Sequence, residues 1–242
     1  MKRSSFPTAA LTLSAVIVTL ACARPMQTQD VKSPAKSPYP SSMAPLEQYL
    51  MDQNAEIALA RSAAPDSISK DAEVMVFGPK GYETAVKGHN GFVCIVHRSW
   101  ASEAEDPEFW NPNRRGPMCL NAAGARSYIP NTMMRTRLVL AGRSKDQMFA
   151  AVEVAIDKKE LPPLEAGAMC YMLSKQGHLS DRDGHWHPHL MFFLPSAEAA
   201  TWGANLAGSP IFEDDDAADR MTVMMVPVTT WSDGSSDSAK GH

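Results

Sequence analysis

The order in which helix patterns and strand patterns follow one another limits this chain to one class of fold. A helix pattern comes first, three strand patterns follow it, and two helix patterns then precede three further strand patterns. The expected helices cover residues 45–63, 132–141 and 144–159, and the expected strands cover residues 72–77, 82–87, 92–100, 168–174, 188–194 and 221–229. Strands and helices do not alternate, which argues against a doubly wound parallel sheet. We therefore expect an α+β fold, with an antiparallel or mixed sheet of about six strands and three to four helices.

The helix at residues 144–159 has the clearest local signals. Ser144 and Gln147 form a capping-box pair at its start. Met148, Val152 and Ile156 then recur at a spacing of four, which places them on one face of a helix. This pattern predicts a helix that buries one apolar stripe.

The first three strands are expected to form a β-meander. Glycines bound the two turns between them, at 78–81 and 88–91, as is typical of hairpin connections. The third strand, residues 92–100, is apolar on both faces, so we expect it in the middle of the sheet.

Two segments are expected to lack regular structure within the domain. Residues 101–131 are rich in proline and read as a long loop, and such loops often serve a function. Trp110, Arg114 and Arg115 of this loop are candidates to line a groove for an anion or a peptide. The alternative is a packed tryptophan with two solvated arginines. The acidic residues 213–216 are expected in a solvated loop.

The N-terminus reads as an export signal. Lys2 and Arg3 give a positive start, and the apolar run that follows, residues 9–21, is shorter than the roughly 20 residues of a transmembrane helix. Residues 1–23 are therefore expected to be a signal peptide. Cleavage after Ala23 is one expectation; the other is a lipid anchor on Cys22, since the preceding residues resemble a bacterial lipobox.

The rest of the chain divides into three expected parts. Residues 24–43 are rich in Pro, Ser, Lys and Gln and predict a disordered tether. Residues 44–232 are expected to form a single α+β domain, and residues 233–242 a disordered tail. The protein is thus expected in the periplasm, anchored to the outer membrane, or secreted. Its formal charge of −4 gives no footprint for nucleic acid, and no transmembrane span is expected in the mature chain.

Three cysteines follow the expected signal peptide: Cys94, Cys119 and Cys170. In an oxidising compartment one disulfide with one spare thiol is an option, and so is no disulfide. All three lie in or beside apolar runs, where cysteine often acts as a small buried hydrophobe.

Most strong catalytic motifs are absent from the sequence. It contains no GxSxG elbow, HExxH motif, phosphate-binding loop, GxGxxG turn or CxxCH site. Residues 67–70 match the SxxK pattern of serine acylating enzymes, but they lack a KTG partner. No serine or cysteine can therefore be assigned as a nucleophile.

A cluster of histidines is the main chemical signal. His178, His185, His187 and His189 fall within twelve residues, with Asp183 among them. Imidazole and carboxylate groups are the ligands that zinc prefers. On a straight strand His185 and His189 would lie about 13 Å apart, so a shared ion requires a bend in the chain. The glycine and proline within the segment make such a bend plausible.

Other interpretations of this cluster stay open. The histidines can be surface or packing residues, with Trp186 anchoring the loop. One of them can act as a general base without metal. Copper is a further candidate, because the chain holds 15 methionines and thioether is a soft ligand. Methionine more often fills irregular cores.

Four stretches carry a resemblance that covers most of the expected domain. They are AMCYMLSKQ at 168–176, GHWHPHLMFF at 184–193, TWGANLAGSP at 201–210 and PV…WSDG at 227–234. Together they resemble a group of uncharacterised exported bacterial proteins with no known activity. The resemblance implies export and a single domain, and it implies no activity.

Two functional hypotheses follow. The first is an exported cell-envelope protein that binds a divalent metal, for which zinc is a better candidate than copper. In one version of this hypothesis the protein is a metal-dependent hydrolase. Its candidate ligands are His178, Asp183, His185, His187 and His189. The second is a non-catalytic binding or scaffold module of the cell envelope.

Overall fold

The computed structural model of this chain describes residues 39–182, 186–196 and 200–238. Over these residues the chain forms five α-helices and one mixed sheet of eight strands, in the order β2-β1-β3-β4-β5-β6-β8-β7. The α+β class is thus confirmed, with more strands and helices than expected. None of the described helices is both long and apolar enough to cross a membrane.

The described elements have the following bounds. The strands are β1 (Glu73–Gly78), β2 (Gly81–Val86), β3 (Val93–His97), β4 (Gly116–Leu120), β5 (Met169–Met172), β6 (His189–Pro195), β7 (Phe212–Asp216) and β8 (Met221–Pro227). The α-helices are α1 (Gln53–Arg61), α2 (Asp66–Ser69), α3 (Ala122–Ser127), α4 (Ile129–Leu140) and α5 (Lys145–Asp157). Short 3₁₀ turns are η1 (Leu46–Gln48), η2 (Ser99–Ala101) and η3 (Ala200–Trp202).

The expected meander of the first three strands is wrong. Strands β1 and β2 do form an antiparallel hairpin, but β3 pairs with β1 in parallel, on the side away from β2. After β2 the chain returns to the start of β1, where the amide of Glu73 bonds to the carbonyl of Phe92. A Cβ at Gly88 would lie 2.0 Å from the nitrogen of Glu73, so this return requires a glycine. The central position of β3 is confirmed, since it lies between β1 and β4.

The expected irregular segments are also corrected. Residues 101–131 contain β4, α3 and the start of α4. Strand β4 was missed because it contains Pro117, and proline argues against a strand assignment. The acidic run 213–216 is part of β7, which lies at the edge of the sheet beside β8. An edge strand can carry these acids because one of its sides faces no other strand.

Helix boundaries follow local capping. The capping box of Ser144 and Gln147 is present at the start of α5, as predicted. The expected helix at 45–63 is instead divided into η1 and α1, because Asp52 caps α1 by accepting a hydrogen bond from the amide of Ala55 at 3.0 Å. The carboxylate so placed also suits the positive end of the helix dipole.

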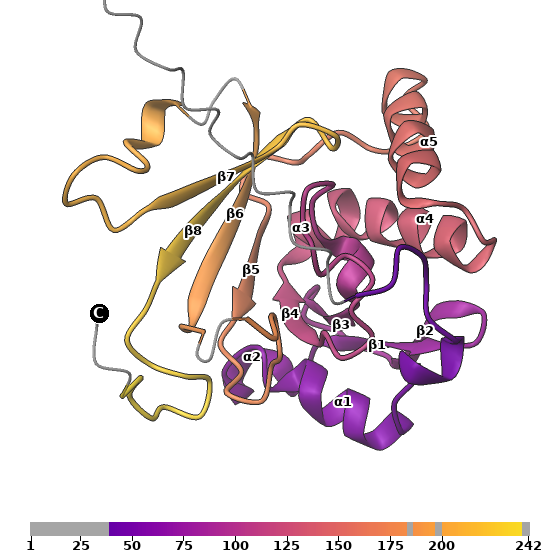
Figure 1. Cartoon of the computed structure of the whole chain (residues 1–242). Helices are drawn as coiled ribbons and strands as arrows, with labels where there is room; N and C mark the ends of the chain where they lie inside the picture. The colour runs from indigo at the N-terminus through magenta and orange to yellow at the C-terminus, as the bar shows by residue number, and fades with distance from the viewer. Residues whose placement is uncertain (1–38, 183–185, 197–199, 239–242) are drawn as a thin grey trace, which may run out of the picture. The chain divides into compact units, whose positions relative to one another are not determined.

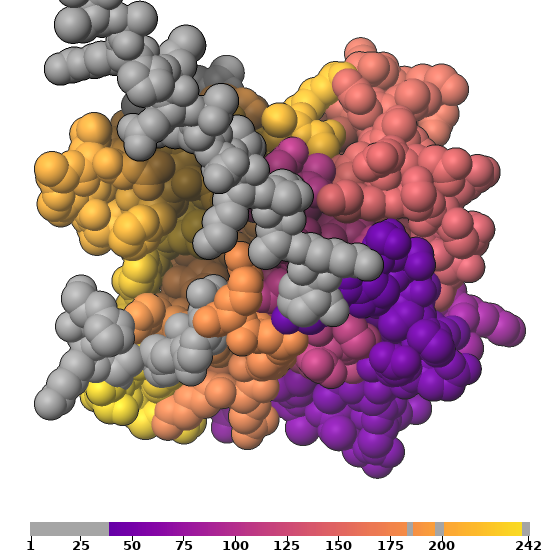
Figure 2. All heavy atoms as spheres, viewed as in Figure 1, coloured from indigo at the N-terminus to yellow at the C-terminus, as the bar shows by residue number. Residues whose placement is uncertain are grey.

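The sheet separates two layers of helices (Figure 1). Figure 1 shows α1 on one side of strands β1–β4 and helices α3, α4 and α5 on the other. Strand alternation directs Cys94 and Val96 of β3 into the core under α1, and Ile95 into the core on the opposite side. In the space-filling view of Figure 2, α1 (indigo to purple) and α5 (salmon) reach the surface at opposite ends of one side.

The cysteines resolve the open question of pairing. Cys94 and Cys119 face each other across β3 and β4 and form a disulfide. Cys170 is a free, fully buried thiol, and burial raises the pKa of this thiol.

The ends of the expected domain make contacts of their own. Tyr39, in the expected tether, donates a hydrogen bond to Asp181. In the expected tail, the amide of Ser235 bonds to the carboxylate of Asp233, and the amide of Asp237 bonds to the carbonyl of Thr229. The boundaries 1–23, 24–43 and 233–242 stay predictions.

Candidate functional site

A groove of about 450 Å³ lies over one face of β4, β5, β6 and β8; we call it the methionine groove. Its floor carries the thioethers of Met118, Met172, Met191, Met221 and Met225. Two histidines, His97 and His189, also line it. Carboxyl groups from the segment after β3 and from β7 complete the lining: Glu103, Asp106, Asp214 and Asp216. An apolar floor with a few polar groups is the usual form of a ligand site.

Of the predicted metal ligands that the structure describes, His178, His187 and His189, only His189 lines this groove. Its Nδ1 lies 2.8 Å from the carbonyl oxygen of His187. Nδ1 therefore carries the ring proton and donates a hydrogen bond to this oxygen. Among the described residues Nε2 has no hydrogen-bond partner, and it keeps its lone pair. Burial lowers the pKa of His189, which favours this neutral form.

The ring of His189 is held in place by aromatic packing. It meets Trp186 edge to face at 5.6 Å, and Trp186 packs in turn against Trp231 at 5.4 Å. The indole also donates to the carbonyl of Gly177, where a Cβ would come within 2.8 Å of the ring. Trp186 therefore does anchor the loop, as one interpretation of the cluster expected.

The other described histidines of the cluster bind separate carboxylates. His178 pairs with Asp181, and Nδ1 of His187 lies 2.6 Å from Asp237. Within residues 39–182, 186–196 and 200–238, no three His, Cys, Asp or Glu side chains gather as a metal shell would. His185 and Asp183 lie outside the described residues, so the full predicted set stays a prediction.

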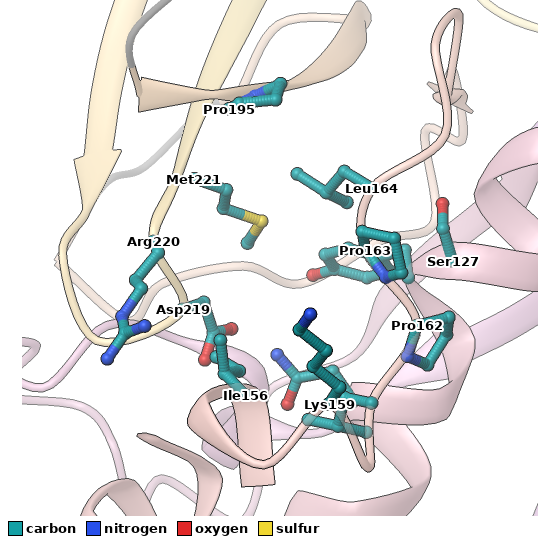
Figure 3. Close-up of a pocket in the computed structure, with 13 residues that line it drawn as sticks. Ser127, Ile156, Lys159, Pro162, Pro163, Leu164, Pro195, Asp219, Arg220 and Met221 are labelled. Atoms are coloured by element: carbon teal, nitrogen blue, oxygen red, sulfur yellow. The ribbon is translucent and has the colours of Figure 1, made fainter. Parts of the chain in front are cut away.

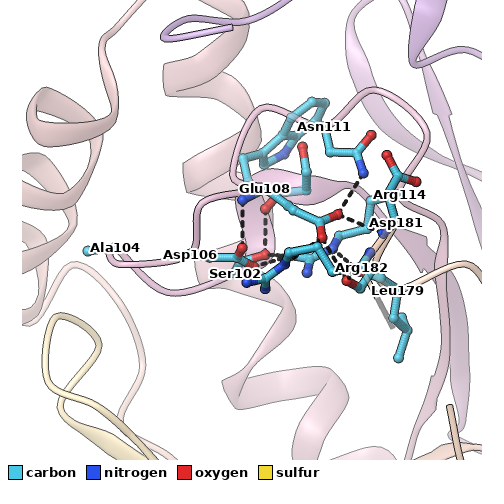
Figure 4. Close-up of polar contacts among 12 residues, drawn as sticks. Ser102, Ala104, Asp106, Glu108, Asn111, Arg114, Leu179, Asp181 and Arg182 are labelled. Atoms are coloured by element: carbon cyan, nitrogen blue, oxygen red, sulfur yellow. Dashed lines mark hydrogen bonds and ion pairs between the residues drawn. The ribbon is translucent and has the colours of Figure 1, made fainter. Parts of the chain in front are cut away.

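Glu108 fixes the start of the histidine segment (Figure 4). Its carboxylate is completely buried and accepts hydrogen bonds from four donors. These are Ser180 Oγ at 2.6 Å, Asn111 Nδ2 at 2.8 Å, the Asp181 amide at 3.0 Å and Arg182 Nε at 3.0 Å. Burial opposes ionisation, but the hydrogen bonds outweigh it and hold the pKa of Glu108 at about 2.

The loop residues that the sequence proposed for an anion or peptide groove make contacts within the fold, and of the three only Arg114 lines the methionine groove. Trp110 is buried in the main core. Arg114 pairs with Asp106 and donates to Ser102 and Leu179 (Figure 4). Arg115 donates to the backbone carbonyls of Pro112, Arg114 and Gln48. Both guanidinium groups are thus engaged by the protein itself.

A pair of carboxyl groups, Glu103 and Asp214, lies at the edge of the methionine groove. The hydrogen bond to Asp214, burial and the charges of nearby aspartates raise the pKa of Glu103 to about 8. At neutral pH the carboxyl group of Glu103 therefore keeps its proton. The two residues are more than a hundred positions apart, and no sequence motif marks them.

Replacing Glu103 by glutamine is expected to stabilise the protein at alkaline pH. A raised pKa in the folded state means that stability declines as pH rises from about 4.5 to about 8. The glutamine variant lacks this decline, so it should be more stable than the wild type at pH 9 by up to about 1 kcal/mol, since solvent screens the pair. Urea unfolding at pH 5 and 9 measures the difference; Glu105→Gln, in an exposed position, is the control. Lower stability of Glu103→Gln at pH 9 would contradict the assignment.

His97 lies at the inner end of the groove and is neutral. Burial and the charges of Arg135 and Arg98 lower its pKa to about 3. Its ring stacks on Tyr128, which stacks on Phe193 at 4.3 Å. This stack forms a rigid wall of the groove.

A second cavity, of about 490 Å³, lies between the end of α5 and the turn joining β7 to β8. In Figure 3, Lys159 extends its amine between Asp219 and Pro163, whereas Arg220 points away. Asp219 pairs with Arg135 at 2.7 Å, and Arg220 pairs with Asp157 at 2.7 Å. The rest of the lining is mostly apolar, with Lys159 as a further charged group. The methionine groove, which brings two histidines and five methionines together, is the stronger candidate site.

Part of this groove could be predicted from the sequence. His189 and Met191 lie two residues apart in β6 and share a face, as strand alternation predicts. Met118 and His97 come from strands whose neighbours in the sheet a single sequence does not reveal. Comparison with known proteins finds no matching family model, no matching curated protein and no matching solved structure.

Proposed function

We propose that this protein is an exported cell-envelope protein that binds a transition-metal ion through the histidine segment 178–189. The observation that carries the proposal is the state of His189. A neutral imidazole that lines a groove and donates a hydrogen bond from Nδ1 to a backbone carbonyl is the arrangement typical of metal-ligating histidines. The proposal concerns binding alone and includes no hydrolytic step.

The anchoring of the segment supports the proposal. Glu108 holds residues 180–182 by three hydrogen bonds, and Trp186 packs against Trp231. The ends of the segment are therefore fixed before any ion arrives. Fixed ligands lower the entropic cost of binding. His185 and Asp183 lie between these two anchors in the sequence and remain candidate ligands.

Export is supported by the disulfide between Cys94 and Cys119, because such bonds persist mainly in oxidising compartments. Mass spectrometry of the mature N-terminus distinguishes the two expected forms. Acylated Cys22 indicates a lipid anchor, whereas an unmodified chain starting at Arg24 indicates a soluble exported protein. Retention of residues 1–23 would remove the export proposal.

Replacing His189 by alanine is expected to weaken metal binding at least tenfold, since even changes behind the ligands of metal sites cost about 10–100-fold in affinity. The measurement is competitive titration of the purified mature chain with Zn²⁺ and with copper. His187→Ala tests the neighbouring ring in the same assay. His89→Ala is the matched control, because His89 is exposed in a distant turn.

The outcome of this titration decides the proposal. Loss of affinity in His189→Ala with full affinity in His89→Ala supports it. If each metal binds all three variants as tightly as it binds the wild type, metal binding is removed as the function.

A second candidate function is a non-catalytic binding module for apolar molecules. The size of the methionine groove favours it, because flexible thioethers adapt to varied apolar ligands. This candidate would be favoured if an apolar ligand displaces a fluorescent apolar probe equally from the wild type and from His189→Ala, and if neither protein binds a metal specifically.

A further inference from the structure

We propose that the methionine groove holds monovalent copper, with His189 and the thioethers of Met172 and Met191 as its central ligands and Met118 and Met225 beside them. The inference rests on the proposed metal-binding function and names its ion. It keeps His189 from that proposal and adds thioether ligands, so that the ligands come from four strands, β4, β5, β6 and β8.

The pairing of the strands brings these side chains together. Met172 lies directly opposite His189 across β5 and β6, and Met191 lies opposite Met225 across β6 and β8. Continuing the antiparallel register from the pair of Cys119 and Tyr171 places Met118 beside Met172. Directly opposed residues have Cβ atoms about 4.5–5.5 Å apart, within reach of a common ion for long side chains.

All five ligands point to the same side of the sheet. His189 and Met191 are two positions apart in one strand, and their cross-strand partners share their face. Each of the five lines the groove. Met118 and Met172 are 2% and 5% exposed, so an ion between them would be shielded from water.

The donor chemistry selects the ion. Thioethers are neutral, soft donors that suit monovalent copper, whereas zinc prefers thiolate, imidazole and carboxylate. Within the described part of the chain no three residues of that second kind converge. His189 adds one neutral nitrogen, with Nδ1 already bonded to a carbonyl.

Core filling is the alternative role for these methionines, since Met118 and Met172 also belong to the main hydrophobic core. Met169 provides the comparison, because it lies three residues from Met172 in β5 and pairs with Phe192 on the opposite face. Exchange of methionine for leucine nearly conserves volume and usually costs less than about 1.5 kcal/mol. Met172→Leu and Met169→Leu are therefore matched variants that should both fold.

The test is titration of the full mature chain with Cu(I) against bicinchoninate, under anaerobic conditions with ascorbate. Met172→Leu and Met191→Leu are each expected to lower Cu(I) affinity at least tenfold. Replacing a residue that only supports a metal ligand already costs about 10–100-fold in affinity, and these variants remove a ligand itself. Met169→Leu is expected to bind as the wild type does. Cys170 lies opposite Met191 across β5 and β6, but it is fully buried and does not line the groove, so Cys170→Ala is expected to keep full affinity.

Spectroscopy gives a second measurement. Labelling methionine methyl groups with ¹³C and adding Ag(I), a redox-inert soft ion, should shift the methyl signals of the groove methionines and leave that of Met169 in place. Equal shifts for Met169 and Met172 would overturn the proposal.

The results separate this inference from the proposed function. Unchanged Cu(I) affinity in Met172→Leu and Met191→Leu, or loss of affinity in Cys170→Ala alone, overturns the thioether site. If His189→Ala still loses Zn²⁺ in that case, the metal-binding function stands. If His189→Ala changes no metal affinity at all, both fail.

Discussion

Replacing Glu56 by alanine is expected to lower the free energy of unfolding by about 3–5 kcal/mol, the usual result of leaving half of a buried ion pair alone. Glu56 and Arg98 are each 1% exposed, and Nη2 of Arg98 lies 2.8 Å from Oε2 of Glu56. The variant leaves the guanidinium charge inside the protein without its carboxylate. It also removes the acceptor of the Phe77 amide. Urea unfolding at pH 7 measures the loss.

The ion pair joins three elements beside the methionine groove. Arg98 follows the last residue of β3 and also donates to the carbonyls of Tyr49 and Val96, while Glu56 belongs to α1 and binds β1 through Phe77. Loss of the ion pair is thus expected to weaken the packing of α1 against the sheet. The neighbouring wall residue His97 should become less protected from solvent.

Two further variants sharpen this prediction. Glu153→Ala removes an exposed helix glutamate that lies 3.9 Å from Arg220, and it should change stability by no more than about 0.5 kcal/mol. The double variant Glu56→Leu/Arg98→Met should lose less than the two single changes together, because no charge is left unpaired. A loss below about 1 kcal/mol in Glu56→Ala, the level of an exposed pair, would contradict the assignment.

Glu108→Gln is expected to lower the free energy of unfolding by about 3 kcal/mol at pH 7 and to reduce the acid dependence of stability. The pKa of Glu108 is about 2 in the folded protein, against an ordinary value of 4.5, and each unit is worth about 1.4 kcal/mol. Because the folded-state pKa is depressed, the stabilisation is complete above about pH 4.5. It is lost as pH falls from there through about 2.

The physical cause is the set of four donors around the carboxylate. A glutamine can accept through one oxygen, but its amide group would face Asn111 and the Asp181 amide as a second donor. Denaturation by urea at pH 7 and pH 3 should therefore show a smaller difference in the variant than in the wild type. Glu105→Gln, an exposed change in the same loop, should behave as the wild type does. An equal acid response in Glu108→Gln would show that other groups carry it.

The same variant also tests how the site is built. Glu108 accepts hydrogen bonds from residues 180–182 at the start of the histidine segment. These three residues, and its fourth partner Asn111, do not line the methionine groove. Copper affinity should therefore persist in Glu108→Gln at pH 7, while any binding that depends on the anchored residues 180–182 should weaken.

Local patterns in the sequence were sufficient for most individual elements. The capping box and apolar spacing predicted α5, and alternating or continuous apolar runs predicted β1, β2, β3, β5, β6 and β8. These signals are local, because a helix cap and a strand's alternation depend on residues a few positions apart. Strands β4 and β7 were missed for the same reason. Pro117 and the acids 213–216 contradict a strand locally, and only pairing with distant neighbours stabilises them there.

The tertiary structure decided which chemistry comes together. The sequence placed four histidines within twelve residues, yet His178 and His187 bind separate aspartates and His189 faces methionines from other strands. Nearness in sequence does not imply convergence, since each side chain's direction depends on the local backbone and on the partner that it reaches. The sequence by itself determined the α+β class and the face that His189 shares with Met191. The groove exists only because β4, β5, β6 and β8 pair across long separations in the chain, and strand pairing depends on packing of the whole sheet.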